Sequence, residues 1–174
     1  MLLAWIALTF NRLVRWRNRV DEAWAQIDVE LKRRYDLVPA LLGAVQGYLG
    51  QEQAVLTRVA EARSSAVAAP DVDGHAQADS ALTGALRSLL AVVEAYPELR
   101  SQERVLALQE ELATTEDRIA YARGYYNAGV VEYETARLTF PSNLVASLLR
   151  FAPRRPFAAD ITSRGPVEVN LVGT

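Results

Sequence analysis

The residue types that carry most enzyme chemistry are scarce in this chain of 174 residues. Cysteine is absent and His75 is the single histidine, which excludes disulfides, thiolate metal sites, cysteine nucleophiles and any site that needs two histidines. Glutamates and tyrosines are frequent in residues 103–140, but a di-iron site would need inward glutamates and Glu-x-x-His pairs, and the chain has no such pair. We therefore predict no catalytic residue, no metal site and no cofactor.

The basic residues are the second group with chemical potential. All but Lys32 of the 19 are arginine, which makes bidentate contacts with phosphates and carboxylates, although a bias in genome composition would give the same excess. The net charge is +2 over residues 1–49, −7 over residues 50–117 and +3 over residues 118–174. The overall charge of −2 and the acidic middle argue against a nucleic-acid-binding protein.

The first ten residues, MLLAWIALTF, carry no charged side chain, and four arginines follow before Asp21. This order is the reverse of a cleaved signal peptide and is typical of an anchor whose following part stays in the cytoplasm. Ten residues rise about 15 Å as a helix, against a hydrocarbon core of about 30 Å. We therefore predict a truncated or half-inserted anchor remnant at residues 1–12. Alternatively, these side chains extend the first helix of the core.

Apolar spacing predicts helices in four segments of residues 13–151, the helical bundle domain. The first ends in a break at Tyr35–Pro39, and one long kinked helix is the alternative. In the second, a stripe of small residues predicts close packing against a neighbouring helix, rather than a dimer contact of the kind found in membranes. The stripe consists of Gly43, Gly47, Gly50 and Ala54. A loop is expected at residues 69–74, with His75 beside it as a solvated residue.

The fourth segment has the strongest pattern. Large apolar residues recur every seven positions, at Val105, Leu112, Ile119, Tyr126, Tyr133 and Phe140. This heptad predicts a long helix packed nearly parallel or antiparallel to its partners. We therefore expect an all-α fold, an antiparallel up-and-down four-helix bundle, with Tyr126 buried in the middle of the seam.

The last part of the chain is expected to hold a short apolar helix at residues 142–151 and a flexible tail at residues 152–174, with room for a strand at residues 167–171. In an up-and-down bundle the fourth helix ends where the first begins, so arginines from both ends gather at one pole. There the short helix either lies in a membrane interface or covers the end of the core. The predicted membrane-facing residues are Leu2, Leu3, Trp5, Ile6, Arg12, Arg15, Arg17, Arg19, Leu148, Arg150, Arg154 and Arg155.

Two stretches resemble the signatures of the LemA family. Residues 10–49, FNRLVRWRNRVDEAWAQIDVELKRRYDLVPALLGAVQGYL, resemble the opening signature. Residues 96–141, from Tyr-Pro-Glu-Leu through Leu-Gln-Glu-Glu-Leu to Phe-Pro, resemble the closing one. This chain departs from the family pattern at Ala40 and Glu134, where asparagine is usual.

The resemblance implies a bacterial protein with a short membrane anchor, a cytoplasmic up-and-down four-helix bundle and no established enzymatic activity. Family members are often encoded beside membrane-bound proteases or TPM-domain proteins. We therefore expect a membrane-associated scaffold or adaptor at the cell membrane. Its partners would be lipids at the N-terminus and other envelope proteins, without nucleic acid or a small-molecule substrate. The alternative is an enzyme or small-ligand carrier that uses polar groups inside the bundle.

Overall fold

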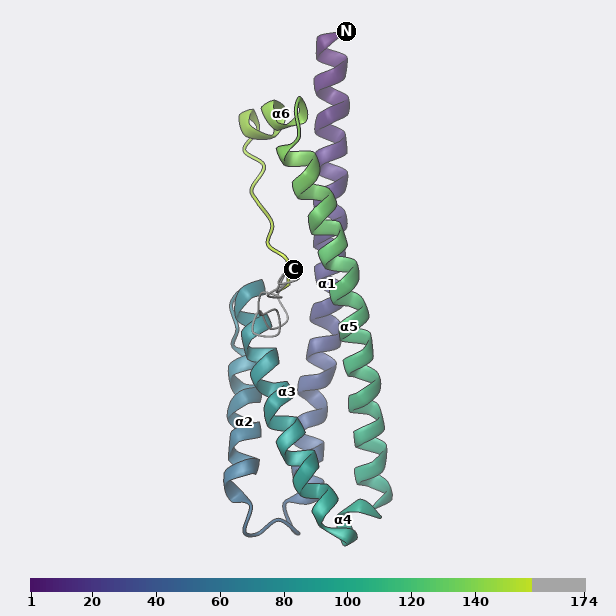
Figure 1. The fold of residues 1–174 in the computed structure, drawn as a ribbon, viewed down its shortest axis with the longest axis vertical. Helices are drawn as coiled ribbons and strands as arrows, with labels where there is room; N and C mark the ends of the chain where they lie inside the picture. The colour runs from purple at the N-terminus through teal and green to yellow at the C-terminus, as the bar shows by residue number, and fades with distance from the viewer. Residues whose placement is uncertain (158–174) are drawn as a thin grey trace, which may run out of the picture.

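The computed structural model describes residues 1–157, which form six helices and no strand. The helices are α1 (Leu2–Val45), α2 (Gln53–Val67), α3 (Val72–Ala95), α4 (Pro97–Arg100), α5 (Glu103–Leu138) and α6 (Ser142–Leu148). The four longer helices alternate in direction along the chain (Figure 1). The prediction of an all-helical protein is confirmed for these residues, and the expected strand at residues 167–171 lies outside them.

The pairing of α1 with α5 is the most extensive contact in the molecule, and α2 pairs with α3 beside it (Figure 1). The heptad of α5 supplies one side of the core: its first five positions, from Val105 to Tyr133, are all buried. The sixth position, Phe140, is exposed because α5 ends at Leu138. The heptad therefore predicted the buried face of α5 correctly as far as the helix extends.

α1 is continuous through Pro39, so the expected break at Tyr35–Pro39 is wrong and the single helix is observed. A proline inside a helix leaves the carbonyl four residues earlier without its N–H partner. Here that carbonyl belongs to Tyr35, and it accepts a hydrogen bond of 2.7 Å from Nε of Arg63 on α2. A side chain of the neighbouring helix thus replaces the donor that Pro39 lacks.

The close packing expected at the glycine stripe is also wrong. Gly43, Gly47 and Gly50 are exposed, with open space where a β-carbon would point. α1 ends at Val45, so the last two lie in the turns between α1 and α2 instead of on a helix face. The glycine at a helix contact is Gly129 of α5, where a β-carbon would lie 3.6 Å from Val20 of α1.

α3 begins earlier than the sequence suggested. The carboxylate of Asp71 accepts a hydrogen bond of 2.7 Å from the backbone N–H of Gly74, an N-cap that starts the helix within the expected loop. His75 therefore lies in the first turns of α3, half-buried, with its ring 5.7 Å from that of Trp24. The prediction of a solvated loop histidine is wrong for this reason.

Candidate functional site

The beginning of α1 and the helix α6 lie together at one end of the molecule, which we call the N-terminal pole (Figure 1). Leu13 of α1 is buried against Val145 and Ala146 of α6, and Ile6 packs partly on the same cluster. Leu144, Leu148 and Leu149 are exposed. α6 thus covers the end of the core with one face and presents apolar side chains on the other.

The predicted membrane-facing residues fall into two groups. Leu2, Leu3, Trp5 and Ile6 form the first turns of α1, where Leu3 and Trp5 are exposed. Arg12, Arg15, Arg17, Arg19 and Arg150 are also exposed, and within residues 1–157 none of these five forms an ion pair. No helix among the described residues has an apolar stretch long enough to cross a membrane.

Arg154 and Arg155 behave differently from the other arginines that were expected at the pole. Arg154 forms an ion pair with Asp21 of α1, with 2.7 Å between its Nη2 and the Oδ1 of the aspartate. Arg155 forms an ion pair with Asp73 of α3, with 2.8 Å between its Nη1 and the Oδ2 of the aspartate. Both arginines are therefore engaged with the helical body, because the segment that carries them turns back along it.

That segment, residues 152–157, is held on α5, and we call it the strap (Figure 1). The hydroxyls of Tyr133 and Tyr126 donate to the carbonyls of Ala152 and Arg155 at 2.7 and 2.9 Å. Glu134 accepts from the backbone N–H of Arg154 at 2.7 Å. The expectation of a flexible tail from residue 152 is therefore wrong as far as residue 157.

The end of the strap is anchored by an aromatic side chain. Phe157 is 1% exposed, and the amide of Asn127 accepts from its N–H at 2.8 Å and donates to its carbonyl at 3.2 Å. The Trp24 ring lies 6.0 Å from the Phe157 ring, and the guanidinium of Arg123 lies 4.7 Å above it. The strap thus fills a site built by α1 and α5, and the ring of His75 on α3 lies 5.7 Å from that of Trp24.

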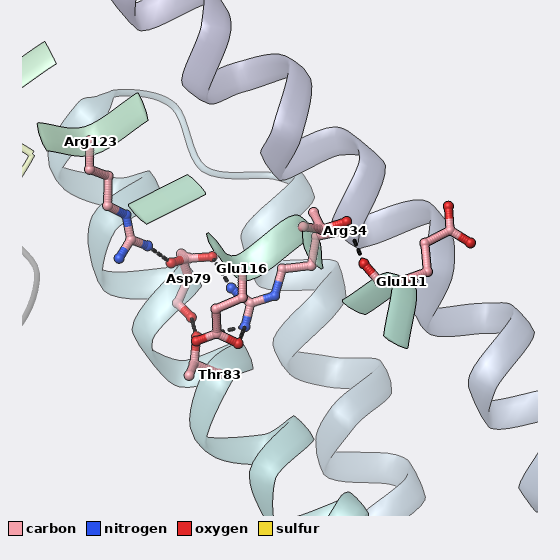
Figure 2. Close-up of polar contacts among 7 residues, drawn as sticks. Arg34, Asp79, Thr83, Glu111, Glu116 and Arg123 are labelled. Atoms are coloured by element: carbon pink, nitrogen blue, oxygen red, sulfur yellow. Dashed lines mark hydrogen bonds and ion pairs between the residues drawn. The ribbon is translucent and has the colours of Figure 1, made fainter. Parts of the chain in front are cut away.

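Beneath this site, three charged side chains from three helices meet (Figure 2). Nη1 of Arg34 on α1 donates to Oδ1 of Asp79 on α3 at 2.8 Å. Arg123 of α5 donates to the other oxygen of the same carboxylate. Arg34 also donates to the hydroxyl of Thr83 at 2.6 Å, and Glu116 lies 4.0 Å from its Nη2. Arg34 and Asp79 are each 1% exposed.

The chemistry of this cluster favours a structural role. Arginine does not release its proton under ordinary conditions, and both oxygens of Asp79 are occupied by guanidinium groups. Tyr35, next to Arg34, has a buried hydroxyl without a hydrogen-bond partner in the described part of the chain, and burial, reinforced by Asp79, raises its pKa to about 12. The cluster therefore holds α1, α3 and α5 together through hydrogen bonds between charged groups.

Sequence reasoning missed the cluster, although a signal was present. Arg34 continues the apolar stripe of Ile27, Leu31 and Val38, and Asp79 lies between Ala76 and Leu82 on the buried stripe of α3. A charged residue at a core position needs a partner of opposite charge. Had the stripes been tested for charged members, these two residues would have been found.

The interior offers little support for the alternative function in catalysis or ligand transport. A groove of about 700 Å³ lies between α1 and α5, but it is open to solvent and lined mainly by exposed residues such as Val29 and Tyr121. Over the described residues, no group of three or more histidine, cysteine, aspartate or glutamate side chains is placed to hold a metal ion.

These features define a small all-helical protein with an apolar, arginine-rich pole and an internally held strap. The sequence places it further: residues 23–171 match the model of the LemA family, and the chain belongs to that family. The resemblance noted in residues 10–49 and 96–141 is thereby confirmed.

Individual relatives are more distant. Protein LemA of Metamycoplasma hominis is 28% identical over 145 residues, which cover 80% of this chain and 64% of the relative. Magnetosome protein MamQ 2 of Paramagnetospirillum magneticum is 23% identical over 175 residues, which cover 86% of this chain and 64% of the relative. Magnetosome protein MamQ of Magnetospirillum gryphiswaldense is 34% identical over 74 residues, 42% of this chain and 27% of the relative. The chain spans slightly less than two thirds of the first two relatives, and the names of all three mention no reaction.

Proposed function

We propose that this LemA-family protein is a non-enzymatic scaffold that stands on the cytoplasmic face of the cell membrane as an up-and-down four-helix bundle. Residues 1–12 and the exposed face of α6 contact lipid, and the rest of the body is available to other membrane or envelope proteins. The observation that carries the proposal is the composition of the N-terminal pole. There, exposed apolar side chains lie among five arginines that have no acidic partner within residues 1–157.

The physical basis is the combination of two weak contributions. A basic side chain near an anionic membrane surface contributes about 1 kcal/mol, and salt screens this attraction within a Debye length of about 8 Å. Apolar side chains such as Leu148 and Trp5 add burial in the interface. Since one signal alone gives only marginal binding, the two together are needed for stable association.

Sedimentation of the full chain with liposomes tests the proposal. We expect binding to vesicles with anionic lipid, weaker binding as salt is raised, and little binding to neutral vesicles. Reversing Arg12, Arg15 and Arg19 to glutamate should abolish binding. The matched control reverses the same number of exposed arginines at the opposite end of the body, namely Arg87, Arg100 and Arg104, and should retain it. Equal binding by both triple variants, or no binding by the unaltered chain, would contradict the lipid-facing role of the pole.

A further inference from the structure

We propose that the groove filled by the strap is a binding site for an extended segment of a partner protein. The segment would carry two adjacent basic residues and, two positions after the second, an aromatic side chain. The strap itself shows this chemistry in the order Arg154, Arg155, Pro156 and Phe157, and acts as an internal occupant that the partner displaces. This inference does not depend on lipid contact at the N-terminal pole.

The first argument is the kind of contact that α5 makes with the strap. Tyr126, Asn127, Tyr133 and Glu134 direct five hydrogen bonds to backbone atoms of residues 152–157 and none to a strap side chain. Backbone-directed contacts of this kind recognise any extended chain and recur in peptide-binding proteins. The affinity that they supply is therefore not restricted to the strap of this chain.

The second argument is that side chains at fixed positions supply selectivity. Phe157 is buried in contact with the Trp24 ring and the Arg123 guanidinium, as a buried anchor is at a protein interface. Asp21 and Asp73 face the two arginines at 2.7 and 2.8 Å. These pairs are partly or largely exposed to solvent, so they select for positive charge while adding little affinity.

The third argument is that the strap reaches the hydrophobic core at one point, where Phe157 packs among the core side chains. The strap follows α6 in sequence and contributes no helix, and within residues 152–157 Phe157 is the single fully buried side chain. Because the strap is part of the same chain, it competes for the groove at a high effective concentration. A partner can bind only those molecules in which the groove is open, so its apparent affinity is the intrinsic affinity multiplied by that fraction.

The test uses the full chain and a labelled synthetic peptide, RFAPRRPF, which reproduces residues 150–157. Phe157→Ala in the protein weakens the strap, and this variant should bind the peptide at least about tenfold more tightly than the unaltered chain. A peptide with alanine for the final phenylalanine should not bind, and one with glutamate for both adjacent arginines should bind less tightly. Fluorescence anisotropy measures binding. The imidazole NMR signals of His75, the single histidine, report whether the groove is filled, because its ring lies against Trp24.

Further variants keep the test decisive. Arg154→Glu with Arg155→Glu opens the strap without altering the buried anchor pocket, and this protein should also bind the peptide. Asn127→Ala, added to Phe157→Ala, should remove binding, whereas Thr114→Ala at an exposed position of α5 should not. Absence of binding to both opened proteins up to about 1 mM, the effective concentration of a short flexible tether, would overturn the proposal. Strap-dependent dimers seen by light scattering would also overturn it, since the occupant would then be a second copy of this chain.

Discussion

Removal of the Asp79 carboxylate is the most severe test of the structure. The side chain is 1% exposed and holds Arg34, which is equally buried, and Arg123. In the Asp79→Ala protein, Arg34 keeps only the hydroxyl of Thr83 and a glutamate oxygen 4.0 Å away. Removing one partner of a buried ion pair costs about 3–5 kcal/mol. We expect a loss of that size, a large share of the 5–15 kcal/mol that typically separates folded from unfolded domains.

Removal of an arginine should cost less, and the difference is informative. In Arg34→Met the carboxylate keeps Arg123, so we expect a loss of about 1–3 kcal/mol. The double variant Arg34→Met with Asp79→Leu leaves no unpaired buried charge at Arg34. The loss of unfolding free energy in the double variant should be about 1–3 kcal/mol smaller than the sum of the losses for Arg34→Met alone and Asp79→Leu alone.

Urea unfolding followed by far-UV circular dichroism measures these differences as shifts of the midpoint at constant slope. Asp117→Ala, at an exposed position of α5, is the control and should change stability by less than about 0.5 kcal/mol. Two results would refute this reasoning, because either would mean that the cluster does not hold the three helices. One is a loss of under about 1 kcal/mol for Asp79→Ala. The other is a loss in the double variant equal to the sum of the losses of Arg34→Met and Asp79→Leu.

Four other substitutions test particular contacts by the same urea assay. Tyr35→Phe removes a buried hydroxyl without a partner within residues 1–157, so at pH 7 it should be neutral or stabilising by up to about 1 kcal/mol. Because the folded pKa is about 12 against about 10 unfolded, the unaltered protein should lose up to about 3 kcal/mol from this group between pH 10 and 12, and the variant should not. Gly43→Ala should stabilise α1 by about 0.5–1 kcal/mol. Arg63→Met should cost about 1–2 kcal/mol, and less in a Pro39→Ala background, where an N–H returns to the Tyr35 carbonyl. Tyr126→Ala should cost about 3–5 kcal/mol; a near-zero change would contradict its burial.

Periodic features were predictable from the sequence because helix geometry alone converts spacing into burial. The apolar residues of α5 recur every seven positions and therefore lie on one face of a helix. That buried face can be predicted without knowing which helix packs against it. The same holds for Leu13, Val20, Ile27 and Leu31 of α1, which are all buried.

Helix ends and interruptions were predicted poorly because each depends on a single polar contact. The N-cap at Asp71 and the hydrogen bond from Arg63 to the Tyr35 carbonyl decide where α3 begins and whether α1 continues. Neither contact has a periodic signature. Gly43 and Gly47 show the opposite case, in which a spacing pattern was present but misleading. Their small-residue spacing predicted a neighbouring helix, and no neighbouring atom lies where their β-carbons would point.

The strap was not predictable for a related reason. Phe157 is one apolar residue in a proline-rich stretch without a period, and Asn127, its hydrogen-bond partner, is 30 positions earlier. Spacing along the chain carries no information about contacts at that separation. A signal did exist on α5, where Asn127 and Glu134 lie seven residues apart and both turn out to bind the strap backbone.

Arg123 connects the buried cluster with the strap. Its guanidinium donates to Asp79 and lies 4.7 Å from the Phe157 ring, so one cation serves a carboxylate below it and an aromatic face above it. A guanidinium above an aromatic ring is attracted to the face of that ring, and here the Asp79 carboxylate holds the guanidinium in place. Arg123 therefore contacts both the buried cluster and the aromatic ring that the strap places in the groove. Under the proposed displacement of the strap, an occupant without an aromatic anchor would leave this cation facing water, whereas an aromatic anchor would shield it and strengthen its contact with Asp79. We therefore expect Arg123 to favour an aromatic side chain in the proposed groove, and loss of the Phe157 ring to weaken the contact between Arg123 and Asp79.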